Sequence, residues 1–257
     1  MNNKVGICAA NYVGYEILKY ILEKDIDSIK FIVTSGTDDW EEKIYDLVKK
    51  TDIDIHRKIN CNSEEFKNVI TTNNINLMLL LWWPQIIKND VIDLVPAGTV
   101  NLHPSLLPYN RGKHPYYWSI VEGTPAGVSI HFITKNIDDG AVIYQREIET
   151  DITITGEELY EKSLQEMISL YKENHDDILS LNFAPIEQNN KFSTFHWAKD
   201  IEKNSKIDLV KHYKAIDLIN IMRARTFKRG NSAYFFHEGE KYNIRIEISK
   251  DRTKQIK

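Results

Sequence analysis

The sequence predicts an α/β fold in which a mostly parallel sheet is followed by a smaller part of different composition. The first observation is a series of short apolar runs, such as Val5-Gly6-Ile7-Cys8-Ala9-Ala10, that are typical of strands covered on both faces. The second is that stretches of helical periodicity separate these runs as far as Leu181. Because strands and helices alternate, we expect the strands to pair in parallel through crossover helices.

Strands and helices follow one another through the first half of the chain. The opening strand leads through a short turn at Asn11 into a helical pattern, which is a Rossmann-like start. Asn62, with Glu65 three positions later, predicts a capped helix to about Thr72. The predicted strands are 5–10, 29–34, 53–56 and 75–81, and the predicted helices are one carrying Ile17 to Leu22, then 38–50, 62–72 and one that ends at about 94.

The segment 98–112 carries the most suggestive polar residues. Residues 98–102 form a short apolar strand, and Pro104 and Pro108 then prevent a regular element. Asn101 and His103 are two residues apart, so strand geometry points both side chains to the same face. In α/β sheets the carboxyl ends of strands are where ligands bind. An amide there can stabilise an oxyanion, and an imidazole can move a proton.

The second half of the chain continues with a helix from Pro115 to about Glu122 and strands at 127–133 and 141–148. Thr155 and Glu158 predict a capping box for a helix to about 181. The segment 185–190 reads as a linker. We therefore expect a catalytic domain at 1–184 and a small α+β domain at 185–257.

The small C-terminal part is predicted to contain a strand at 191–195 and a helix, capped by Ser205 and Asp208, that reaches Met222. It ends in a β-hairpin, with strands at 233–236 and 242–248 and Gly239 supplying a positive φ in the turn. The edge of this hairpin would suit a dimer contact.

Composition excludes several classes. The formal net charge of −4 argues against a nucleic-acid partner bound through its phosphates. Cys8 and Cys61 are far apart and form no CxxC pattern, so we expect reduced thiols without a disulfide or a zinc site. The N-terminus resembles no signal peptide, and the apolar run 75–83 is too short to span a bilayer. These features predict a cytoplasmic protein with no metal and no membrane partner.

Three motifs carry a resemblance to a known family. They are NLHPSLLPYNRG at 101–112, GVSIH at 127–131 and IDDGAVIYQ at 137–145. Together they resemble the folate-dependent formyltransferases, which include glycinamide ribonucleotide, methionyl-tRNA and sugar N-formyltransferases. The likeness extends to about residue 150. It implies the formyltransferase fold, with 10-formyltetrahydrofolate as formyl donor and no metal.

The resemblance also implies catalytic residues. Asn101, His103 and Asp138 match the family's catalytic Asn, His and Asp. The family places this carboxylate two positions before a glycine, which selects Asp138 rather than Asp139. His131 alternates with apolar residues on its strand, and we interpret it as a structural histidine.

Binding residues are implied in the same way. Two segments would hold the folate, and their residues are Trp83, Gln85, Ile86 and Ile87, together with Ile133, Thr134 and Ile137. Arg111, Lys113 and the Asn11-Tyr12 turn could bind a pyrophosphate. Tyr116 or Trp83 could stack on a nucleotide base.

Among possible acceptors the residues favour a sugar. Segments 111–118 and 223–227 resemble the sugar enzymes, although Lys228-Arg229-Gly230 stands where those enzymes often have prolines. The family's glycine-rich phosphate loop is replaced by 10–13, which argues against glycinamide ribonucleotide. The implied acceptor is a nucleotide-linked amino sugar such as dTDP-4-amino-4,6-dideoxyglucose, whose product would serve lipopolysaccharide O-antigen or another surface polysaccharide. Dimers are common among these enzymes, so we expect a homodimer.

Three alternatives stay open. A methionyl-tRNA formyltransferase usually has a longer, basic C-terminal barrel. A formyltetrahydrofolate hydrolase usually carries an extra N-terminal regulatory domain, which the sequence does not show. A non-catalytic folate or nucleotide-sugar binding protein could share the fold, but the complete set of Asn101, His103 and Asp138 argues against it.

Overall fold

The computed structural model describes residues 3–36, 39–230 and 232–251. The chain forms two compact units that interleave along the sequence. Unit 1 contains Met1–His103, Val128–Arg146 and Leu164–Asn189, and unit 2 contains Pro104–Gly127, Glu147–Ser163 and Asn190–Lys257. Unit 2 therefore includes two segments that precede residue 184, Pro104–Gly127 and Glu147–Ser163. The domain boundary that we expect between residues 184 and 185 stays a prediction.

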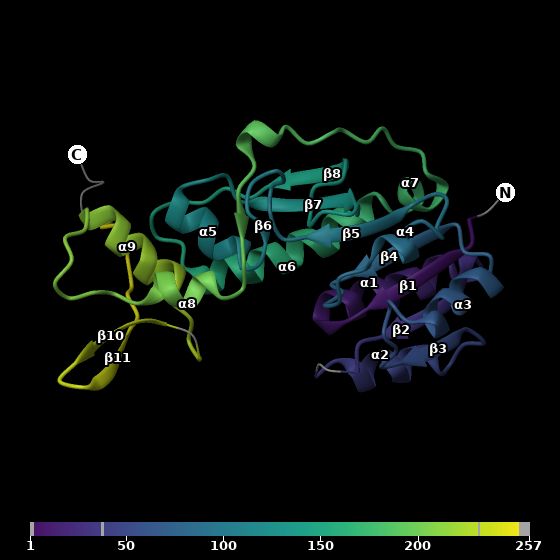
Figure 1. Ribbon diagram of the computed structural model, residues 1–257, viewed down its shortest axis with the longest axis horizontal. Helices are drawn as coiled ribbons and strands as arrows, with labels where there is room; N and C mark the ends of the chain where they lie inside the picture. The colour runs from purple at the N-terminus through teal and green to yellow at the C-terminus, as the bar shows by residue number, and fades with distance from the viewer. Residues whose placement is uncertain (1–2, 37–38, 231, 252–257) are drawn as a thin grey trace. The chain divides into compact units, whose positions relative to one another are not determined.

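Unit 1 is built on a seven-stranded sheet with the strand order β3-β2-β1-β4-β5-β7-β8 (Figure 1). The pairs β3-β2, β2-β1, β1-β4 and β4-β5 are parallel, whereas β5 and β7 are antiparallel. The predicted α/β fold with a mostly parallel sheet is thus confirmed. The strands are β1 (Val5–Ala9), β2 (Ile29–Thr34), β3 (Asp54–Arg57), β4 (Leu77–Leu81), β5 (Thr99–His103), β7 (Gly127–Phe132) and β8 (Val142–Glu147).

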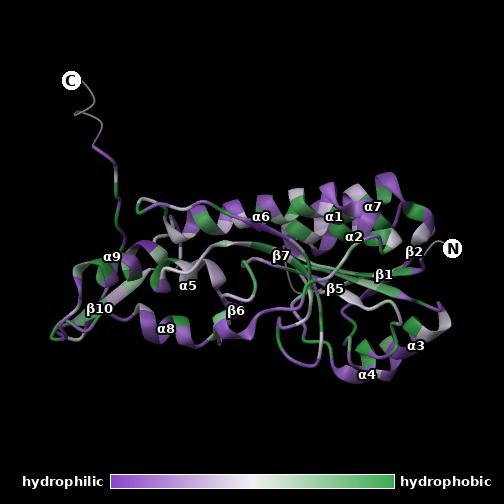
Figure 2. Ribbon diagram, turned by 90° about the horizontal axis from the view of Figure 1, so that it is seen from above, coloured by the Kyte–Doolittle hydropathy of each residue, from purple (hydrophilic) through white to green (hydrophobic). Residues whose placement is uncertain are grey.

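Helices cover both faces of this sheet. Figure 2 shows α1 (Asn11–Lys24), α2 (Glu41–Val48) and α7 (His175–Ser180) on one face, and α3 (Glu64–Thr72) and α4 (Asn89–Ile92) on the other. Every residue of β1 and β4 is buried, as their continuous apolar runs predict. A short 3₁₀ turn (Ile26–Ser28) links α1 to β2, and α6 (Gly156–Glu173) precedes α7.

The two cysteines lie in the same core cluster, between the sheet and α3, although they are far apart in sequence. Both are free thiols and fully buried. Burial raises the pKa of the Cys8 thiol, and a hydrogen bond with Cys61 raises it further. Because the thiolate is the reactive form, both cysteines are expected to behave as inert core residues.

Three predicted helices of unit 1 differ in detail. The N-cap of α3 is Ser63, whose Oγ accepts a hydrogen bond from Phe66 N at 3.2 Å, and not Asn62. The helix predicted to reach 94 is reduced to the four residues of α4. The helix predicted to reach 181 is interrupted at Asn174, where the side chain donates to Leu170 O and competes with helix continuation. The predicted start of the second helix, residue 38, lies outside the described residues.

Unit 2 contains short elements around a small apolar cluster of Ile207, Ile221 and Ala233. β6 pairs in parallel with β9, and β10 with β11 form the predicted antiparallel hairpin. Glu238 and Gly239 both have positive φ in its turn, which matches the twist of the strands. The elements are β6 (Arg111–Gly112), α5 (Pro115–Glu122), a 3₁₀ turn (Asn190–Phe192), β9 (Phe195–His196), α8 (Asp200–Ser205), α9 (Ala215–Ala224), β10 (Ala233–His237) and β11 (Glu240–Ile244).

Two predictions for unit 2 are wrong. The strand expected at 191–195 is a 3₁₀ turn followed by the two residues of β9. Ser205 does not begin a helix but ends α8, where its Oγ donates to Ile201 O, and Asp208 accepts from Val210 N in a local turn. Serine and aspartate can close a turn as readily as they start a helix, so their presence did not decide between these outcomes.

Within the described ranges, no helix is both long and apolar enough to cross a bilayer. Over the same ranges, the His, Cys, Asp and Glu side chains form no group of three or more arranged to hold a metal ion.

Candidate active site

The antiparallel pairing of β5 with β7 gathers polar side chains on one face of the sheet. Asn101 lies opposite His131, and His103 lies opposite Ser129. Opposite residues in such a pair point to the same side, and so do residues two apart on one strand. All four side chains therefore share one face at the carboxyl end of β5.

The loop after β7 brings a carboxylate to this face. Asp138 adopts a left-handed backbone conformation, with φ of 53°. Gly140 passes so close to Phe132 that an added Cβ would lie 2.0 Å from its carbonyl oxygen, so only glycine fits. Gln188 Nε2 donates to the carbonyl oxygens of Asp138 at 2.9 Å and Gly140 at 2.7 Å. These contacts fix the turn that presents Asp138.

The three predicted catalytic side chains lie together. Asp138 Oδ2 is 3.6 Å from His103 Nδ1, and the His103 and Asp138 side chains are 7% and 13% exposed. Asn101 is on the same strand face as His103. The arrangement can therefore accept a proton on His103 while Asn101 supplies a neutral hydrogen-bond donor.

His131, which its alternation with apolar residues predicts to be a structural histidine, lies beside these three side chains. Its Nε2 is 3.3 Å from Asn101 Nδ2 and 3.7 Å from Asp138 Oδ1. The side chain is completely buried. The sequence signal was the polar alternation of Ser129 and His131, but only the register between β5 and β7 shows that His131 faces Asn101.

The first predicted folate segment, 83–87, is held in place by hydrogen bonds of the Gln85 and Asn62 side chains. Gln85 Oε1 accepts from Cys61 N at 3.0 Å, and Gln85 Nε2 donates to Ile59 O at 3.1 Å. Asn62 Nδ2 donates to Ile86 O at 2.8 Å, and Asn62 Oδ1 accepts from Lys88 N at 2.7 Å. The Gln85 side chain thus braces the segment, and any contact of Gln85 with a ligand falls to its backbone.

The other residues of this segment differ in exposure. Ile86 is 69% exposed, whereas Ile87 is buried in the core cluster. The Trp83 ring packs against that cluster, and within the described part of the chain its buried Nε1 has no hydrogen-bond partner. A buried indole N–H without a partner is uncommon, and core packing of the Trp83 ring leaves this atom closed to solvent.

The second predicted folate segment follows β7. Ile133 packs against the same core cluster as Trp83, and its N–H donates to Thr99 O at 2.9 Å. Thr134 Oγ1 and Asn136 Nδ2 both donate to the Asp139 carboxylate. Asp139 therefore closes a local turn, which separates its role from that of Asp138. Ile137 is half-buried beside it.

Predicted acceptor-binding residues fall in both units. In unit 1, Asn11 starts α1 with φ of 58°, and the Tyr12 ring lies 5.2 Å from that of Trp40. In unit 2, Arg111 donates to Asn190 Oδ1 at 2.8 Å, and Lys113 is exposed. Their roles stay predictions.

Tyr116 lies in α5, where its ring meets Tyr160 and Phe227 edge to face. Burial raises the pKa of Tyr116 to about 12, so the phenol is protonated at neutral pH. Little of this ring is accessible for stacking on a base.

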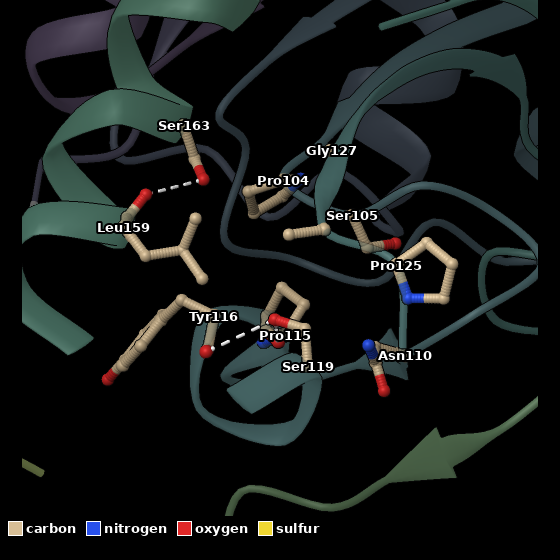
Figure 3. Close-up of a pocket in the computed structure, with 11 residues that line it drawn as sticks. Pro104, Ser105, Asn110, Pro115, Tyr116, Ser119, Pro125, Gly127, Leu159 and Ser163 are labelled. Carbon is tan, nitrogen blue, oxygen red and sulfur yellow. Dashed lines mark hydrogen bonds between the residues drawn. The ribbon is translucent and has the colours of Figure 1, made fainter. Parts of the chain in front are cut away.

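A narrow pocket in unit 2 is lined in part by Tyr116 (Figure 3). None of its eleven lining residues is charged. Ser119 Oγ donates to the carbonyl oxygens of Pro115 and Tyr116, and Ser163 Oγ donates to Leu159 O. These two hydroxyls are already bonded within the protein, and without a charged lining residue the pocket offers no counter-charge to a pyrophosphate.

Comparison with known families decides the class of the protein. The family model described as formyl transferase matches residues 30–174, which is more than half of the chain. The chain belongs to the formyl transferase family. A further model, described as an N-formyltransferase dimerization C-terminal domain, matches residues 200–250. The resemblance seen in the sequence motifs is therefore confirmed.

Solved structures show the formyltransferase fold as well. A sugar N-formyltransferase from Shewanella sp FDAARGOS_354 superposes with a TM-score of 0.82 at 23% identity, covering 96% of this chain and 99% of that one. An N-formyltransferase from Helicobacter canadensis, solved with folinic acid and dTDP-3-aminofucose, gives 0.71 at 24% identity and covers 88% and 81%. At such identities the likeness establishes the fold.

Curated relatives of this family differ in length. The bifunctional polymyxin resistance protein ArnA of Wigglesworthia glossinidia brevipalpis is 26% identical over 87% of this chain and 34% of its own. A methionyl-tRNA formyltransferase of Clostridioides difficile is 26% identical over 56% and 50%. The chain spans half or less of the length of these two formyl transferase relatives. A dTDP-4-amino-4,6-dideoxyglucose formyltransferase of Mycobacterium bovis is 29% identical over 60% of this chain and 65% of its own.

Proposed function

We propose that the protein is a folate-dependent N-formyltransferase that acts on the amine of a nucleotide-linked amino sugar. The observation that carries this proposal is the meeting of Asn101, His103 and Asp138 at the carboxyl end of β5, in a chain of the formyl transferase family. This constellation supplies the donor, the base and the carboxylate that amide-forming transfer to an amine requires.

The attacking amine has to be neutral. A sugar amine with a pKa of about 8 is partly protonated at neutral pH, so a nearby base increases the reactive fraction. The His103 imidazole can take the proton as the new C–N bond forms. Asp138, 3.6 Å away, stabilises the resulting imidazolium. His103 can then return that proton to the departing nitrogen.

The carbonyl oxygen gains negative charge during this step. An N–H of the Asn101 carboxamide can donate to it, and one such donor contributes about 3–4 kcal/mol in comparable sites. Asn101 is half-buried in the middle of β5, so the donor is oriented before the substrate arrives.

The formyl donor that we propose is 10-formyltetrahydrofolate, which supplies the electrophilic carbonyl carbon. The Helicobacter canadensis structure, which contains folinic acid, supports this choice. Segments 83–87 and 133–137 would hold the pterin mainly through backbone groups. These groups fit a flat polar heterocycle in an apolar slot.

The acceptor that we propose is a dTDP-linked amino sugar such as dTDP-4-amino-4,6-dideoxyglucose, on which the Mycobacterium bovis relative acts. The product would be an N-formylated sugar for a surface polysaccharide. We also propose that the reaction takes place in the cytoplasm. The net charge of −4 supports a small acceptor over tRNA.

We also propose that the protein is a homodimer. The match to a dimerization domain at 200–250 supports this state. Within that stretch, Phe236 and Tyr242 of the hairpin are 48% and 45% exposed. Among the residues that the structure describes, no strand pairs with the outer edge of β11, so a second copy could extend the sheet there.

The reaction can be tested directly. The full chain is incubated with 10-formyltetrahydrofolate and a panel of dTDP-, UDP- and GDP-linked amino sugars, and products are read by mass. Formylation of at least one dTDP-linked amino sugar is expected. No formylated sugar from any member of the panel would refute the proposed acceptor class.

A second candidate function is favoured by one observation. Methionyl-tRNA formyltransferases, such as that of Clostridioides difficile, match the catalytic part of the chain. The same assay with methionyl initiator tRNA distinguishes the two functions. Faster transfer to this tRNA than to any sugar nucleotide would replace the proposed acceptor.

A further inference from the structure

We propose that His131 is a positioning residue that fixes the orientation of the Asn101 carboxamide. The inference rests on the proposed function, because it assigns Asn101 as the donor to the formyl oxygen. An amide can face a reacting carbonyl with either its nitrogen or its oxygen, and only the nitrogen end stabilises negative charge. His131 would determine which end is presented.

The sheet register places His131 where it can do this. Asn101 and His131 are direct partners in the antiparallel β5-β7 pair, so their side chains leave the same face from opposite strands. His131 Nε2 lies 3.3 Å from Asn101 Nδ2. The distance is set by two backbones within one sheet and not by a mobile loop.

The other ring nitrogen of His131 fixes the tautomer. Nδ1 is 2.8 Å from the carbonyl oxygen of Phe132. A carbonyl oxygen can only accept, so Nδ1 must carry the hydrogen. In a neutral ring with hydrogen on Nδ1, Nε2 has a lone pair and no hydrogen. Nε2 is therefore an acceptor.

An acceptor at this point selects one orientation of the Asn101 amide. The nitrogen end donates one of its two hydrogens to His131 Nε2, and its second hydrogen can serve the formyl oxygen. The opposite orientation would place Asn101 Oδ1 against the Nε2 lone pair, where two acceptors repel. Since His131 is completely buried, water cannot relieve that repulsion.

The same tautomer of His131 also allows the Asp138 carboxylate to interact with His103. Asp138 Oδ1 is 3.7 Å from His131 Nε2, and its Oδ2 is 3.6 Å from His103 Nδ1. A hydrogen on Nε2 of His131 would draw the carboxylate and turn the Asn101 amide at the same time. With Nε2 as an acceptor, the attraction of Asp138 for a proton is directed at His103.

Kinetics of substituted proteins test this role. His131→Phe keeps the ring volume but removes both hydrogen bonds, whereas His131→Gln can still donate to Phe132 O and accept from Asn101. We expect kcat for the dTDP-linked amino sugar to fall about 10- to 100-fold in His131→Phe, with both KM values nearly unchanged. His131→Gln should retain more of kcat.

A matched control separates positioning from loss of a buried histidine. His175 is 1% exposed in α7 and shares a hydrogen bond with Tyr171. His175→Gln should leave kcat near that of the unsubstituted protein even where it lowers the melting temperature. A loss of kcat in His175→Gln as large as that in His131→Phe would contradict a specific role.

A double substitution tests whether His131 acts through Asn101. Asn101→Ala removes the group being positioned, so adding His131→Phe to it should lower kcat no further. Losses that multiply in the double variant would show that His131 acts independently of Asn101 and would overturn the proposal.

One readout does not depend on activity. The ¹⁵N shifts of the His131 ring, recorded by long-range ¹⁵N–¹H correlation on the full chain, identify its tautomer. We expect the neutral form with hydrogen on Nδ1. Hydrogen on Nε2 would contradict the proposal, even if the protein transfers formyl groups. Absence of transfer by the unsubstituted chain with this tautomer present would refute the proposed function instead.

Discussion

Asp138 stands between two imidazoles, and its chemistry depends on which one can be protonated. Its two carboxylate oxygens lie 3.6 Å from His103 Nδ1 and 3.7 Å from His131 Nε2. The Phe132 carbonyl fixes the hydrogen of His131 on Nδ1. In the proposed mechanism, His131 Nε2 is occupied as the acceptor of the Asn101 amide, and His103 is the imidazole that takes up the proton.

Neighbouring aspartates give a direct test at this scale. Asp138→Asn removes the charge beside His103 and should lower kcat about 100-fold or more, because general acid–base assistance is lost. Asp139→Asn, whose carboxylate accepts from Thr134 and Asn136, should retain most of kcat. Steady-state kinetics of both variants check the assignment, and a larger loss in Asp139→Asn would reverse it.

At the scale of an element, the segment after β4 is the one proposed to present its backbone to the folate. The segment after β4 has little regular structure of its own, and Asn62 fastens it through Ile86 O and Lys88 N. A loop held by two side-chain hydrogen bonds keeps its backbone groups in fixed positions for a flat ligand.

Removing these Asn62 hydrogen bonds should weaken the binding of 10-formyltetrahydrofolate. In Asn62→Ala we expect KM for 10-formyltetrahydrofolate to rise several-fold, while KM for the acceptor stays unchanged, since about 1 kcal/mol per lost hydrogen bond is at stake. Faster amide exchange at Lys88 should accompany the change. Asn68→Ala, on the exposed face of α3, serves as the control. An unaltered KM for 10-formyltetrahydrofolate in Asn62→Ala would show that the Asn62 hydrogen bonds do not contribute to its binding.

Element patterns also show how far sequence could predict the structure. β1 and β4 were predictable because buried parallel strands are continuously apolar, and Asn101 and His103 because alternation places them on one face. The proposed role of His131 could not be predicted from the sequence, because it depends on the register of β7 against β5. Ser63 and Asn62 are adjacent cap formers, and local sequence cannot decide which one caps α3 and which one holds a distant loop.

The smaller unit was the harder one to predict. Its buried apolar cluster is small, so periodicity gives little signal between 191 and 215. Ser205 ends a helix there, although the same residue type commonly begins one. The hairpin was predictable, because its turn requires positive φ at Glu238 and Gly239 and glycine provides it readily.

For the whole molecule, the proposed dimer can be tested by light scattering after size-exclusion chromatography. Phe236→Asp places a charge on the exposed face of the hairpin and should shift the protein toward monomer, because a buried unpaired charge is costly. Phe192→Asp is the matched control, because Phe192 is 55% exposed and lies outside the dimerization match. A monomeric unsubstituted chain would contradict the proposed state.

One comparison of turnover decides whether His103 acts as the catalytic base. Formyl transfer from 10-formyltetrahydrofolate to a dTDP-linked amino sugar is compared between the unsubstituted chain and His103→Ala, after both are shown to have similar melting curves. We expect product from the unsubstituted chain and at least a 100-fold lower kcat in the variant, because the general base is lost. A folded His103→Ala protein with near-normal turnover would contradict it.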